Sequence, residues 1–218
     1  WAEVIRWLEA RPDEAAALLP ATLRLMLSAS EPLDRSIPDR WRALGSAATI
    51  VNMYGQTETT GIVSTFVVPS APTPSDPNVP VGVPIPGMTM SIVDTAGRPL
   101  PAGAVGELVV EGPCVGAGYI GLAGRGVAFQ QEPTTHPIGP RYRTGDRARL
   151  LRDGTIALLG RTDQRVKIRG HRVDPSEIEA VLRQHPEVAA CLVTTWSEPG
   201  EATRLMAMVV PRGTRDGD

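Results

Sequence analysis

Lysine is almost absent from this sequence of 218 residues, which contains 21 arginines but a single lysine, Lys167. A phosphate-binding loop of the form G-x-x-x-x-G-K-[ST] needs a Lys-Ser or Lys-Thr pair, and the sequence has none. A lysine-rich tail for binding nucleic acid is excluded for the same reason. The 24 acidic and 22 basic side chains give a net charge of −2, which also argues against a protein dedicated to nucleic acids or membrane surfaces.

Cysteines, aromatic residues and long apolar runs are scarce as well. Cys114 and Cys191 lie 77 positions apart without a CxxC pair, so we expect neither a disulfide framework nor a zinc site, and we expect a cytoplasmic protein. Aromatic residues make up 4% of the chain, and no apolar run is long enough to span a membrane. Apolar residues nevertheless reach 42%, enough for a packed core. Because the chain begins with Trp1 rather than Met, we expect a piece of a larger protein.

The first part of the chain, residues 1–68, has the pattern of an αβ layer. Amphipathic segments predict two helices, and Pro20 ends the first of them. Short apolar runs predict two buried strands, and strand–helix–strand spacing indicates that these strands are parallel. The predicted elements are a helix over 1–19, a strand over 23–27, a helix over 31–44 and a strand over 48–54.

The second part, residues 79–162, is predicted to form a small antiparallel, β-barrel-like subdomain. A stretch with seven prolines, residues 69–86, precedes it and is interpreted as an extended connector. The turn Arg152-Asp153-Gly154 predicts a hairpin between two of the strands. The predicted strands are 89–93, 107–110, 148–151 and 155–159.

The third part, residues 163–218, is predicted to be the start of a small α+β subdomain. Asp174 is suited to cap a helix, Pro175 to occupy its first position and Glu177 to complete a capping box. The predicted apolar stripe of this helix contains Ile178, Val181 and Leu182, and Pro186 ends it. Strands are predicted around 165–169, 189–195 and 204–210.

The segment that follows the second predicted strand can carry chemistry. It reads Asn-Met-Tyr-Gly-Gln-Thr-Glu-Thr over residues 52–59. Gly55 allows the backbone to approach a ligand closely. Thr57 offers a hydroxyl to a phosphate, and Glu58 is a hard oxygen ligand of the kind that Mg²⁺ prefers. The carboxyl end of a strand is also where open α/β sheets bind ligands. An ordinary polar turn is the alternative for Thr-Glu alone.

Later segments leave more alternatives open. In Tyr-Arg-Thr-Gly-Asp, Asp146 could accept hydrogen bonds from both hydroxyls of a ribose. Spacing alone does not choose between this role and an ordinary turn residue, which is the commoner case. Arg165, Lys167 and Arg169 would share one face of a strand, which could contact phosphates or form a solvated, charged edge. Without interleaved aromatic residues, nucleic-acid binding is the weakest option there. The glycine-rich run 121–126 has the order G-x-x-G-x-G and is interpreted as a loop.

Taken in order, these motifs resemble the adenylate-forming superfamily, which comprises nonribosomal peptide synthetase adenylation domains, acyl- and aryl-CoA ligases and firefly-type luciferases. The resemblance covers nearly the whole chain. It implies the fold of the central to C-terminal part of such an enzyme: an αβ part, a β-barrel and a mobile α+β subdomain. The segments that carry it are 52–59, 106–112, 142–146 and 160–179.

The resemblance implies a nucleotide site. Tyr54 would help to hold the adenine. Asp146 would bind the ribose hydroxyls, and Arg161 would lie close to them. Thr57 would contact the nucleotide phosphate or the acyl carboxylate, and Gly55 would belong to the same cofactor site. The remaining implied ligand is Glu58, which would bind Mg²⁺.

The resemblance also implies a substrate pocket and a moving subdomain. Asp163 would be the hinge about which the C-terminal subdomain rotates. Lys167 and Gly170 would then approach the active site in the thioester-forming orientation. The positions that match the acyl pocket are apolar and small, so we expect an apolar amino acid or a small aryl or aliphatic acid. They are Leu27, Ala29, Met53, Gly61 and Ile62.

The implied reaction is attack of a carboxylate on the α-phosphate of ATP, which gives an acyl-adenylate and pyrophosphate. A thiol then displaces AMP. Mg²⁺ and basic groups neutralise the developing charge. The thiol would belong to the phosphopantetheine arm of a carrier protein in a nonribosomal peptide synthetase, or to CoA. The implied partners are the acid, the carrier protein and neighbouring synthetase domains, without nucleic acid or membrane.

Three residues depart from the family pattern. Gln56 stands where peptide synthetase domains usually have proline, Arg147 where leucine is usual, and Arg165 where glutamine is usual. The serine/threonine/glycine-rich phosphate loop and the amino-group-binding aspartate are expected upstream of Trp1, and the catalytic lysine downstream of Asp218. We therefore expect these 218 residues alone to be inactive. A freestanding acyl- or aryl-CoA ligase, which Gln56 favours, and a non-catalytic module that docks a carrier protein are the alternatives.

Overall fold

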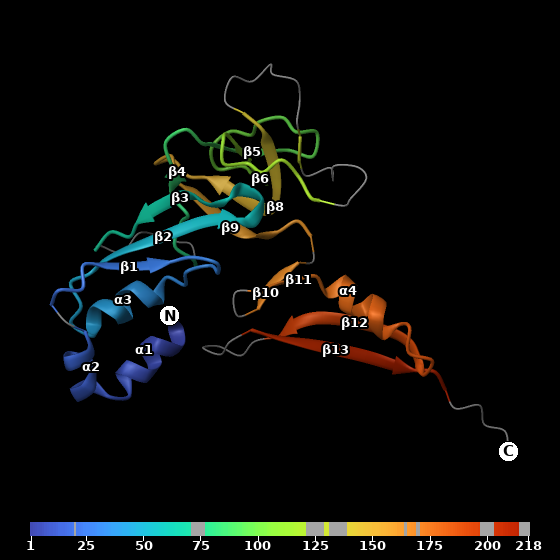
Figure 1. The fold of residues 1–218 in the computed structure, drawn as a ribbon, viewed down its shortest axis with the longest axis horizontal. Helices are drawn as coiled ribbons and strands as arrows, with labels where there is room; N and C mark the ends of the chain where they lie inside the picture. The colour runs from blue at the N-terminus through green and yellow to red at the C-terminus, as the bar shows by residue number, and fades with distance from the viewer. Residues whose placement is uncertain are drawn as a thin grey trace. The chain divides into compact units, whose positions relative to one another are not determined.

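The structure, a computed structural model, describes eight stretches of residues (Figure 1). It divides into two compact units, Trp1–Thr162 and Asp163–Asp218. None of the described helices is both long enough and apolar enough to cross a membrane. The described stretches are 1–19, 21–70, 77–120, 129–130, 139–163, 165–168, 171–196 and 203–213.

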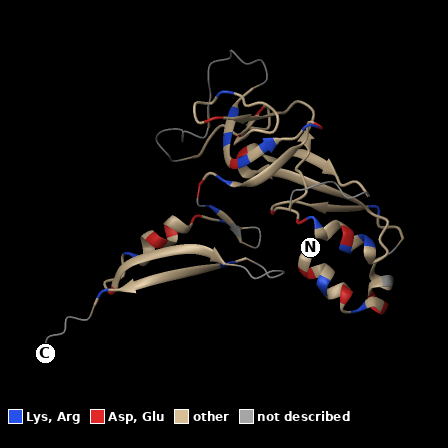
Figure 2. Cartoon of the chain, turned by 180° about the vertical axis from the view of Figure 1, so that it is seen from behind, with Lys and Arg blue, Asp and Glu red and all other residues tan. Residues whose placement is uncertain are grey.

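A helical layer covers one face of the first sheet of unit 1. Ile5 of the first helix and Trp41 of the third are buried in the same cluster as Met26 and Ile50 of the sheet. Figure 2 shows acidic and basic residues along these helices, whereas the strands of the first sheet are mostly uncharged. The helices are α1 (Ala2–Glu9), α2 (Pro12–Leu18) and α3 (Ser36–Ala43).

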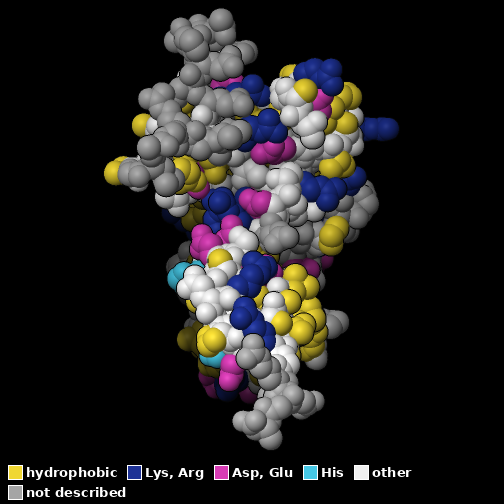
Figure 3. Space-filling view, turned by 90° about the vertical axis from the view of Figure 1, so that its right-hand side faces the viewer, with side chains coloured by type: hydrophobic (Ala, Val, Ile, Leu, Met, Phe, Trp, Pro, Cys, Tyr) yellow, Lys and Arg dark blue, Asp and Glu magenta, His cyan; other side chains and the backbone are white. Residues whose placement is uncertain are grey.

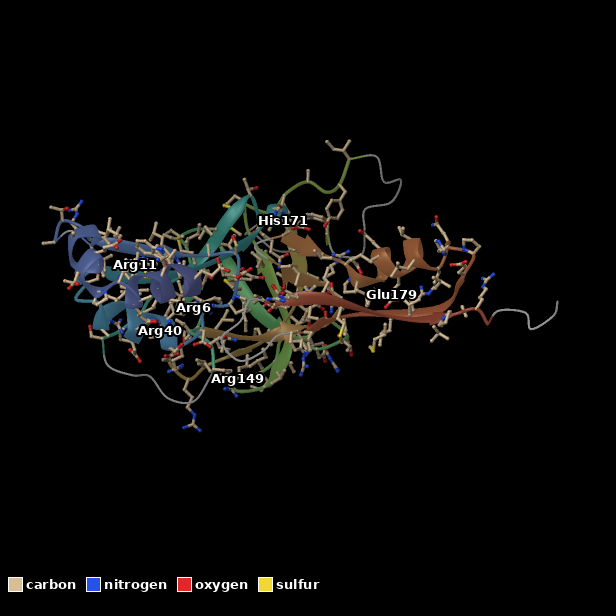
Figure 4. The ribbon with its side chains drawn as sticks, turned by 90° about the horizontal axis from the view of Figure 1, so that it is seen from below. Arg6, Arg11, Arg40, Arg149, His171 and Glu179 are labelled. Atoms are coloured by element: carbon tan, nitrogen blue, oxygen red, sulfur yellow. The ribbon has the colours of Figure 1, made fainter. Side chains whose placement is uncertain are left out.

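Two predicted helices differ from those observed. The single helix expected over 1–19 is interrupted before Pro12, because a proline disfavours helical backbone at the preceding residue, and Arg11 has φ −140° and ψ 64°. The helix expected from residue 31 begins only at Ser36, whose N–H donates to Asp34 Oδ1 at 2.8 Å. The helical layer is also joined by an ion pair, in which Arg40 Nη2 donates to Glu9 Oε2 at 2.6 Å. Figure 4 labels Arg40 in this layer.

The first sheet has the order β1-β2-β3-β4. Its first two strands are parallel, as the sequence predicts, with Leu27 opposite Val51. The first strand is only half buried: Met26 faces the helices, while alternation places Leu25 and Leu27 on the opposite, exposed face. The prediction of a fully buried strand was therefore wrong. The strands are β1 (Leu25–Ser28), β2 (Thr49–Gln56), β3 (Gly61–Val67) and β4 (Val83–Pro84).

The proline-rich stretch is more structured than a plain connector. Residues 71–76 lie outside the described residues, but β4 pairs with β3 within the stretch. Asn52 of β2 also holds it, because its buried Nδ2 donates to the carbonyls of Val79 and Pro80 at 3.2 and 2.9 Å. The expectation of a connector without an element is thus corrected for residues 77–86.

The second sheet of unit 1 is antiparallel throughout, with the order β5-β6-β8-β7 and β9 also paired with β8. Its core includes Leu108 and Tyr142, together with Tyr54 and Val63 of the first sheet, so the two sheets share one hydrophobic cluster. The hairpin at residues 152–154 is confirmed by the bond from Leu151 N–H to the Thr155 carbonyl at 2.7 Å. The strands are β5 (Thr89–Val93), β6 (Val105–Glu111), β7 (Phe129–Gln130), β8 (Arg141–Leu150) and β9 (Ile156–Arg161).

Unit 2 contains two antiparallel strand pairs and one α-helix among its described residues. Asp174 caps the helix, as predicted, by accepting from the N–H of Ser176 at 3.0 Å. The predicted apolar stripe is partly wrong, because Val181 is 66% exposed while Glu179 is buried. Figure 3 shows apolar side chains on the surface of this unit, and β13 is exposed along its whole length. The elements are β10 (Val166–Ile168), β11 (His171–Val173), α4 (Pro175–Leu182), β12 (Val188–Trp196) and β13 (Arg204–Pro211).

Candidate functional site

A buried polar cluster joins the two sheets of unit 1, and the carboxylate of Asp146 lies at its centre. Asp146 is 8% exposed. Its Oδ2 accepts from Tyr54 Oη at 2.5 Å and from Gln56 Nε2 at 2.8 Å. Its Oδ1 accepts from Arg161 Nη1 at 2.5 Å. These bonds use three of the roughly four lone-pair positions of a carboxylate, so the group is oriented before any ligand arrives.

Strand β8 places Asp146 in the cluster, and the prediction that this residue belongs to a turn was wrong. The inward-facing residues of the strand include Tyr142, Thr144 and Asp146, which are all buried. Gly145 between them has φ +73°, a left-handed conformation that favours glycine. Strand β8 therefore continues through the Thr-Gly-Asp segment instead of ending there.

Two further side chains hold the backbone around Asp146. Thr144 Oγ1 accepts from the N–H of Asp146 at 3.0 Å and donates to the Leu108 carbonyl at 2.9 Å. Glu107 Oε1 accepts from the N–H of Gly145 at 3.1 Å, and its Oε2 accepts from the guanidinium of Arg143. Sequence reasoning noted both motifs but assigned no role to Glu107 or Thr144. The sequence did contain a signal for Glu107: a charged residue that follows a glycine, Gly106, at a strand position.

The phenol of Tyr54 acts as a donor in this cluster. Burial is the main factor that raises its pKa well above the ordinary value of 10.0, and the negative charge of Asp146 adds to the effect. Tyr54 therefore stays protonated at neutral pH and can keep its hydrogen bond to the carboxylate. A ligand that reaches Asp146 meets a neutral phenol and a cationic guanidinium from Arg161.

The Thr-Glu turn lies between β2 and β3 as a short 3₁₀ helix, η1 (Thr57–Thr59). Thr57 is exposed, so its hydroxyl is accessible to a ligand. Glu58 is buried, and its Oε1 accepts from Tyr119 Oη at 2.5 Å. Thr59 fixes the turn, because its Oγ1 accepts from the N–H of Gln56 at 3.0 Å and donates to the carbonyl of Gln56. Tyr119, far away in sequence, is a contact that sequence reasoning missed.

The residues expected to line the acyl pocket lie on the first sheet and its connections. Leu27 shares a face with Val51, its partner on β2, and alternation along β2 puts Met53 on that same face. Ile62 of β3 pairs with Gly55. Tyr54 points to the other face of β2. Leu27 and Met53 therefore lie on the face of β2 opposite to Tyr54.

Ala29 and Gly61 complete the expected pocket. Ala29 directly follows β1, and Gly61 begins β3 with φ +101°. Gly61 pairs with Gln56 across the sheet, at the end of β2 that leads into the Thr-Glu turn. Both residues thus lie at the carboxyl end of the parallel strands or directly after it.

The remaining predicted site residues belong to unit 2. Asp163 is its first residue, and its Oδ1 accepts from the N–H of Arg165 at 3.1 Å. Lys167 lies in β10, where its backbone is paired with Arg172. Gly170, Arg169 and the glycine-rich run 121–126 lie outside the described residues. Arg165 lies directly before β10, its side chain is 41% exposed, and its Nε donates to the helix cap Asp174 at 3.2 Å.

A family model described as AMP-binding enzyme matches residues 3–120, which is more than half of the chain. The chain belongs to this AMP-binding family. The match contains the first sheet, the Thr-Glu turn and Glu107.

Among curated proteins, the chain is similar to a probable non-canonical nonribosomal peptide synthetase, CymA, from Salinispora arenicola. The two are 38% identical over 205 residues, which cover 94% of this chain and 2% of that protein. The chain therefore spans only a small part of the curated relatives that it matches.

Among solved structures, the chain is similar to NpsA-ThdA, an artificially fused adenylation–PCP di-domain from Klebsiella oxytoca. The TM-score is 0.76 and the identity 28%, over 97% of this chain and 38% of that one. It is also similar to a malonyl-CoA ligase, solved as a product complex with methylmalonyl-CoA and AMP. There the TM-score is 0.75 and the identity 29%, over 97% of this chain and 43% of that one. These matches confirm the predicted fold class, part of an adenylate-forming enzyme fold.

Proposed function

We propose that the complete protein activates a carboxylic acid with ATP as an acyl-adenylate, and then transfers the acyl group to the phosphopantetheine thiol of a carrier protein in a nonribosomal peptide synthetase. The observation that carries this proposal is the Asp146 carboxylate, buried and oriented by three donors in a chain of the AMP-binding family. Similarity to a peptide synthetase and to an adenylation–PCP di-domain supports the synthetase context.

The nucleotide would bind to unit 1. Asp146 would accept a hydrogen bond from the ribose, and its fixed orientation would spare the cost of reorganisation on binding. Tyr54 would lie at the adenine and Arg161 beside the ribose, while Gly55 and the exposed Thr57 would lie at the phosphate. A positive guanidinium next to the carboxylate also limits repulsion between Asp146 and the polyphosphate.

Glu58 fits a role in binding Mg²⁺. A carboxylate is the oxygen ligand that this ion prefers, and Mg²⁺ in nucleotide sites usually takes one or two carboxylates together with phosphate oxygens. The bond from Tyr119 to Oε1 orients the carboxylate. When bound, the ion would neutralise charge on the phosphates and on the departing pyrophosphate. Glu58 itself would hold the ion next to Thr57, on the same turn.

The acid would lie against Leu27, Ala29, Met53, Gly61 and Ile62. None of these side chains carries a charge that could pair with a charged substrate, so an apolar amino acid or a small aryl or aliphatic acid is the proposed class. For the second step, Asp163 would be the hinge, and Lys167 and Gly170 would approach the thiol. A polar residue at the start of a unit can absorb the backbone rotation that this requires.

Substrate-dependent exchange of pyrophosphate into ATP tests the proposal. The complete gene product is expected to catalyse exchange with apolar acids, whereas the 218-residue chain alone is expected to be inactive. Asp146→Asn should abolish most of the exchange, while Asp153→Asn, in the exposed β8–β9 hairpin, should not change it. A preference for a charged acid would contradict the substrate class. Exchange by the 218-residue chain would contradict the need for groups outside it.

A freestanding CoA ligase is the second candidate, favoured by Gln56 and by the similarity to malonyl-CoA ligase. The thiol acceptor separates the two candidates. Transfer of the acyl group to a phosphopantetheinylated carrier protein, and not to free CoA, supports the synthetase. Transfer to CoA alone supports the ligase.

A further inference from the structure

Gln56 occupies an unusual place in the polar cluster around Asp146. It is the last residue of β2, directly before the Thr-Glu turn, and its side chain is buried. Its Nε2 donates to Asp146 Oδ2 at 2.8 Å and lies 3.2 Å from Tyr54 Oη. At the other end of the same amide, Oε1 accepts from Tyr142 Oη at 3.2 Å. The side chain thus connects two strands, β2 and β8.

The chemistry of its neighbours fixes the orientation of this amide. An ionised carboxylate only accepts hydrogen bonds, so the NH₂ group of Gln56 has to face Asp146. The carbonyl oxygen then faces the hydroxyl of Tyr142, which can donate to it. The backbone is fixed as well, because both the N–H and the carbonyl of Gln56 are bonded to Thr59 Oγ1 at 3.0 Å. Gln56 is therefore held at its side chain and at its backbone.

Oδ2 of Asp146 receives both of its donors from β2, whereas Oδ1 receives Arg161 from β9. Loss of the Gln56 donor would leave Tyr54 as the β2 donor that sets the rotation of the carboxylate. A group held by fewer donors samples more orientations, and a ligand that needs one orientation then binds less tightly.

We infer that Gln56 is a positioning residue for ribose recognition: through its amide it fixes the carboxylate of Asp146 in the orientation that accepts a nucleotide hydroxyl. This inference rests on the proposed function. The competing explanation is that Gln56 only fills space and accepts the hydrogen bond of Tyr142. Two substitutions separate these explanations, because methionine keeps the length of the side chain and glutamate keeps the acceptor for Tyr142.

The experiment compares Gln56→Met and Gln56→Glu in the complete gene product. The kcat and KM of pyrophosphate exchange are measured with ATP and with 2′-deoxy-ATP, which lacks one ribose hydroxyl. Gln184→Met and Gln184→Glu, at an exposed turn after α4, are the matched controls. Circular dichroism and thermal melting show whether each variant is folded.

Gln56→Met is expected to raise the KM for ATP about tenfold to a hundredfold, the range for loss of a hydrogen bond to a charged group, with a smaller change in kcat. The KM for 2′-deoxy-ATP should rise less, so that the preference for ATP shrinks. Gln56→Glu should be worse than Gln56→Met, because it removes the donor and places a second negative charge against Asp146. The Gln184 variants should behave as the unmodified protein.

The inference is overturned if both nucleotides lose the same factor, or if Gln56→Glu retains the KM of the unmodified protein. If the Gln56 variants do not fold, Tyr142→Phe is measured in their place. This substitution removes the hydrogen bond to Gln56 Oε1, so it should also reduce the preference for ATP over 2′-deoxy-ATP. An unchanged preference in that variant also overturns the inference. Absence of exchange in the unmodified protein with every acid tested refutes the proposed function itself, and the role of Gln56 with it.

Discussion

Replacing Gly55 with alanine should separate the two strands that enclose the Thr-Glu turn. Gly55 lies opposite Ile62 in the β2–β3 pair. A Cβ added at Gly55 would lie 1.7 Å from the carbonyl oxygen of Gly61 and 2.8 Å from Cα of Ile62, whereas real Cβ atoms essentially never come closer than 3.0 Å. The neighbouring atoms belong to the backbone, so no side-chain rotation can relieve the clash. The oxygen would have to move away by at least 1.3 Å.

The expected loss of stability follows from this displacement. Forcing extra atoms into a well-packed site usually costs about 1–3 kcal/mol, and more where backbone has to move. In a chain of this length each kcal/mol lowers the melting temperature by roughly 2–4 °C, so Gly55→Ala should melt roughly 2–12 °C lower. Thermal melting followed by circular dichroism, together with urea unfolding, measures the change. The displaced turn should also weaken exchange in the complete gene product.

Gly213→Ala is the matched control, because a Cβ there meets no atom within 4 Å. Its free energy of unfolding should lie within about 0.5 kcal/mol of that of the unmodified chain, as is usual for surface substitutions. If Gly55→Ala were as stable as this control, Gly55 and Gly61 could not be in the close contact that the structure shows. The reasoning about the turn would then be refuted.

Three further substitutions test the polar cluster and unit 2. Tyr54→Phe removes a donor from buried Asp146 and should lower the free energy of unfolding in urea by about 1–3 kcal/mol, whereas an unchanged value would show that the bond contributes little. Glu107→Gln weakens the bonds by which Glu107 holds Arg143 and the N–H of Gly145, next to Asp146. It should raise the KM for ATP roughly two- to tenfold in the exchange assay, and an unchanged KM would contradict the role of Glu107 in positioning this backbone. The pKa of Glu179 lies below its ordinary value of 4.5, mainly because of the hydrogen bond from a backbone N–H and also because of an arginine. Its contribution to stability is thus present above pH 4.5 and lost as the pH falls through the lower native pKa, so Glu179→Gln should flatten the acid loss of stability in thermal melts.

Local patterns in the sequence predicted many of the elements. The parallel pair β1–β2, the hairpin between β8 and β9 and the cap of α4 all depend on residues close together in the chain. In each case a turn residue or an apolar run sits within the element it defines, as Gly154 and Asp174 show. The observed helix boundaries differ from the predicted ones where a proline or a capping side chain is present, as at Pro12.

The same reasoning failed for part of β8 because its inward face is partly polar. Thr144 and Asp146 point into the molecule, while the sequence rule for strands expects apolar residues there. Gly145 added a turn signal in the middle of the strand. Functional sites often break local rules in this way, and neighbouring groups compensate. Glu179 misled the helix prediction similarly, since its buried carboxylate accepts from the N–H of Val193 at 2.8 Å.

The contacts of the site were beyond sequence reasoning for a different reason. Gln56 and Asp146 are 90 residues apart, and Glu58 and Tyr119 are 61 apart. No local pattern states which distant residues will meet. The motifs indicated which residues matter, but the donors and acceptors of each were visible only in the fold. The assigned roles of Thr57, Glu58 and Lys167 stay predictions.

The bond between Tyr54 and Asp146 also has a consequence for how the chain folds. It joins residues 92 positions apart, and closing a flexible loop of that length costs about 4 kcal/mol of chain entropy. Such a contact is unfavourable early, when little else is formed, and contacts of this kind slow folding. The Asp146 carboxylate would therefore reach its partners late, after the separate strands exist. Under the proposed function, a nucleotide would bind only to molecules that have completed this closure, so its binding would measure the fraction of chains that have finished folding.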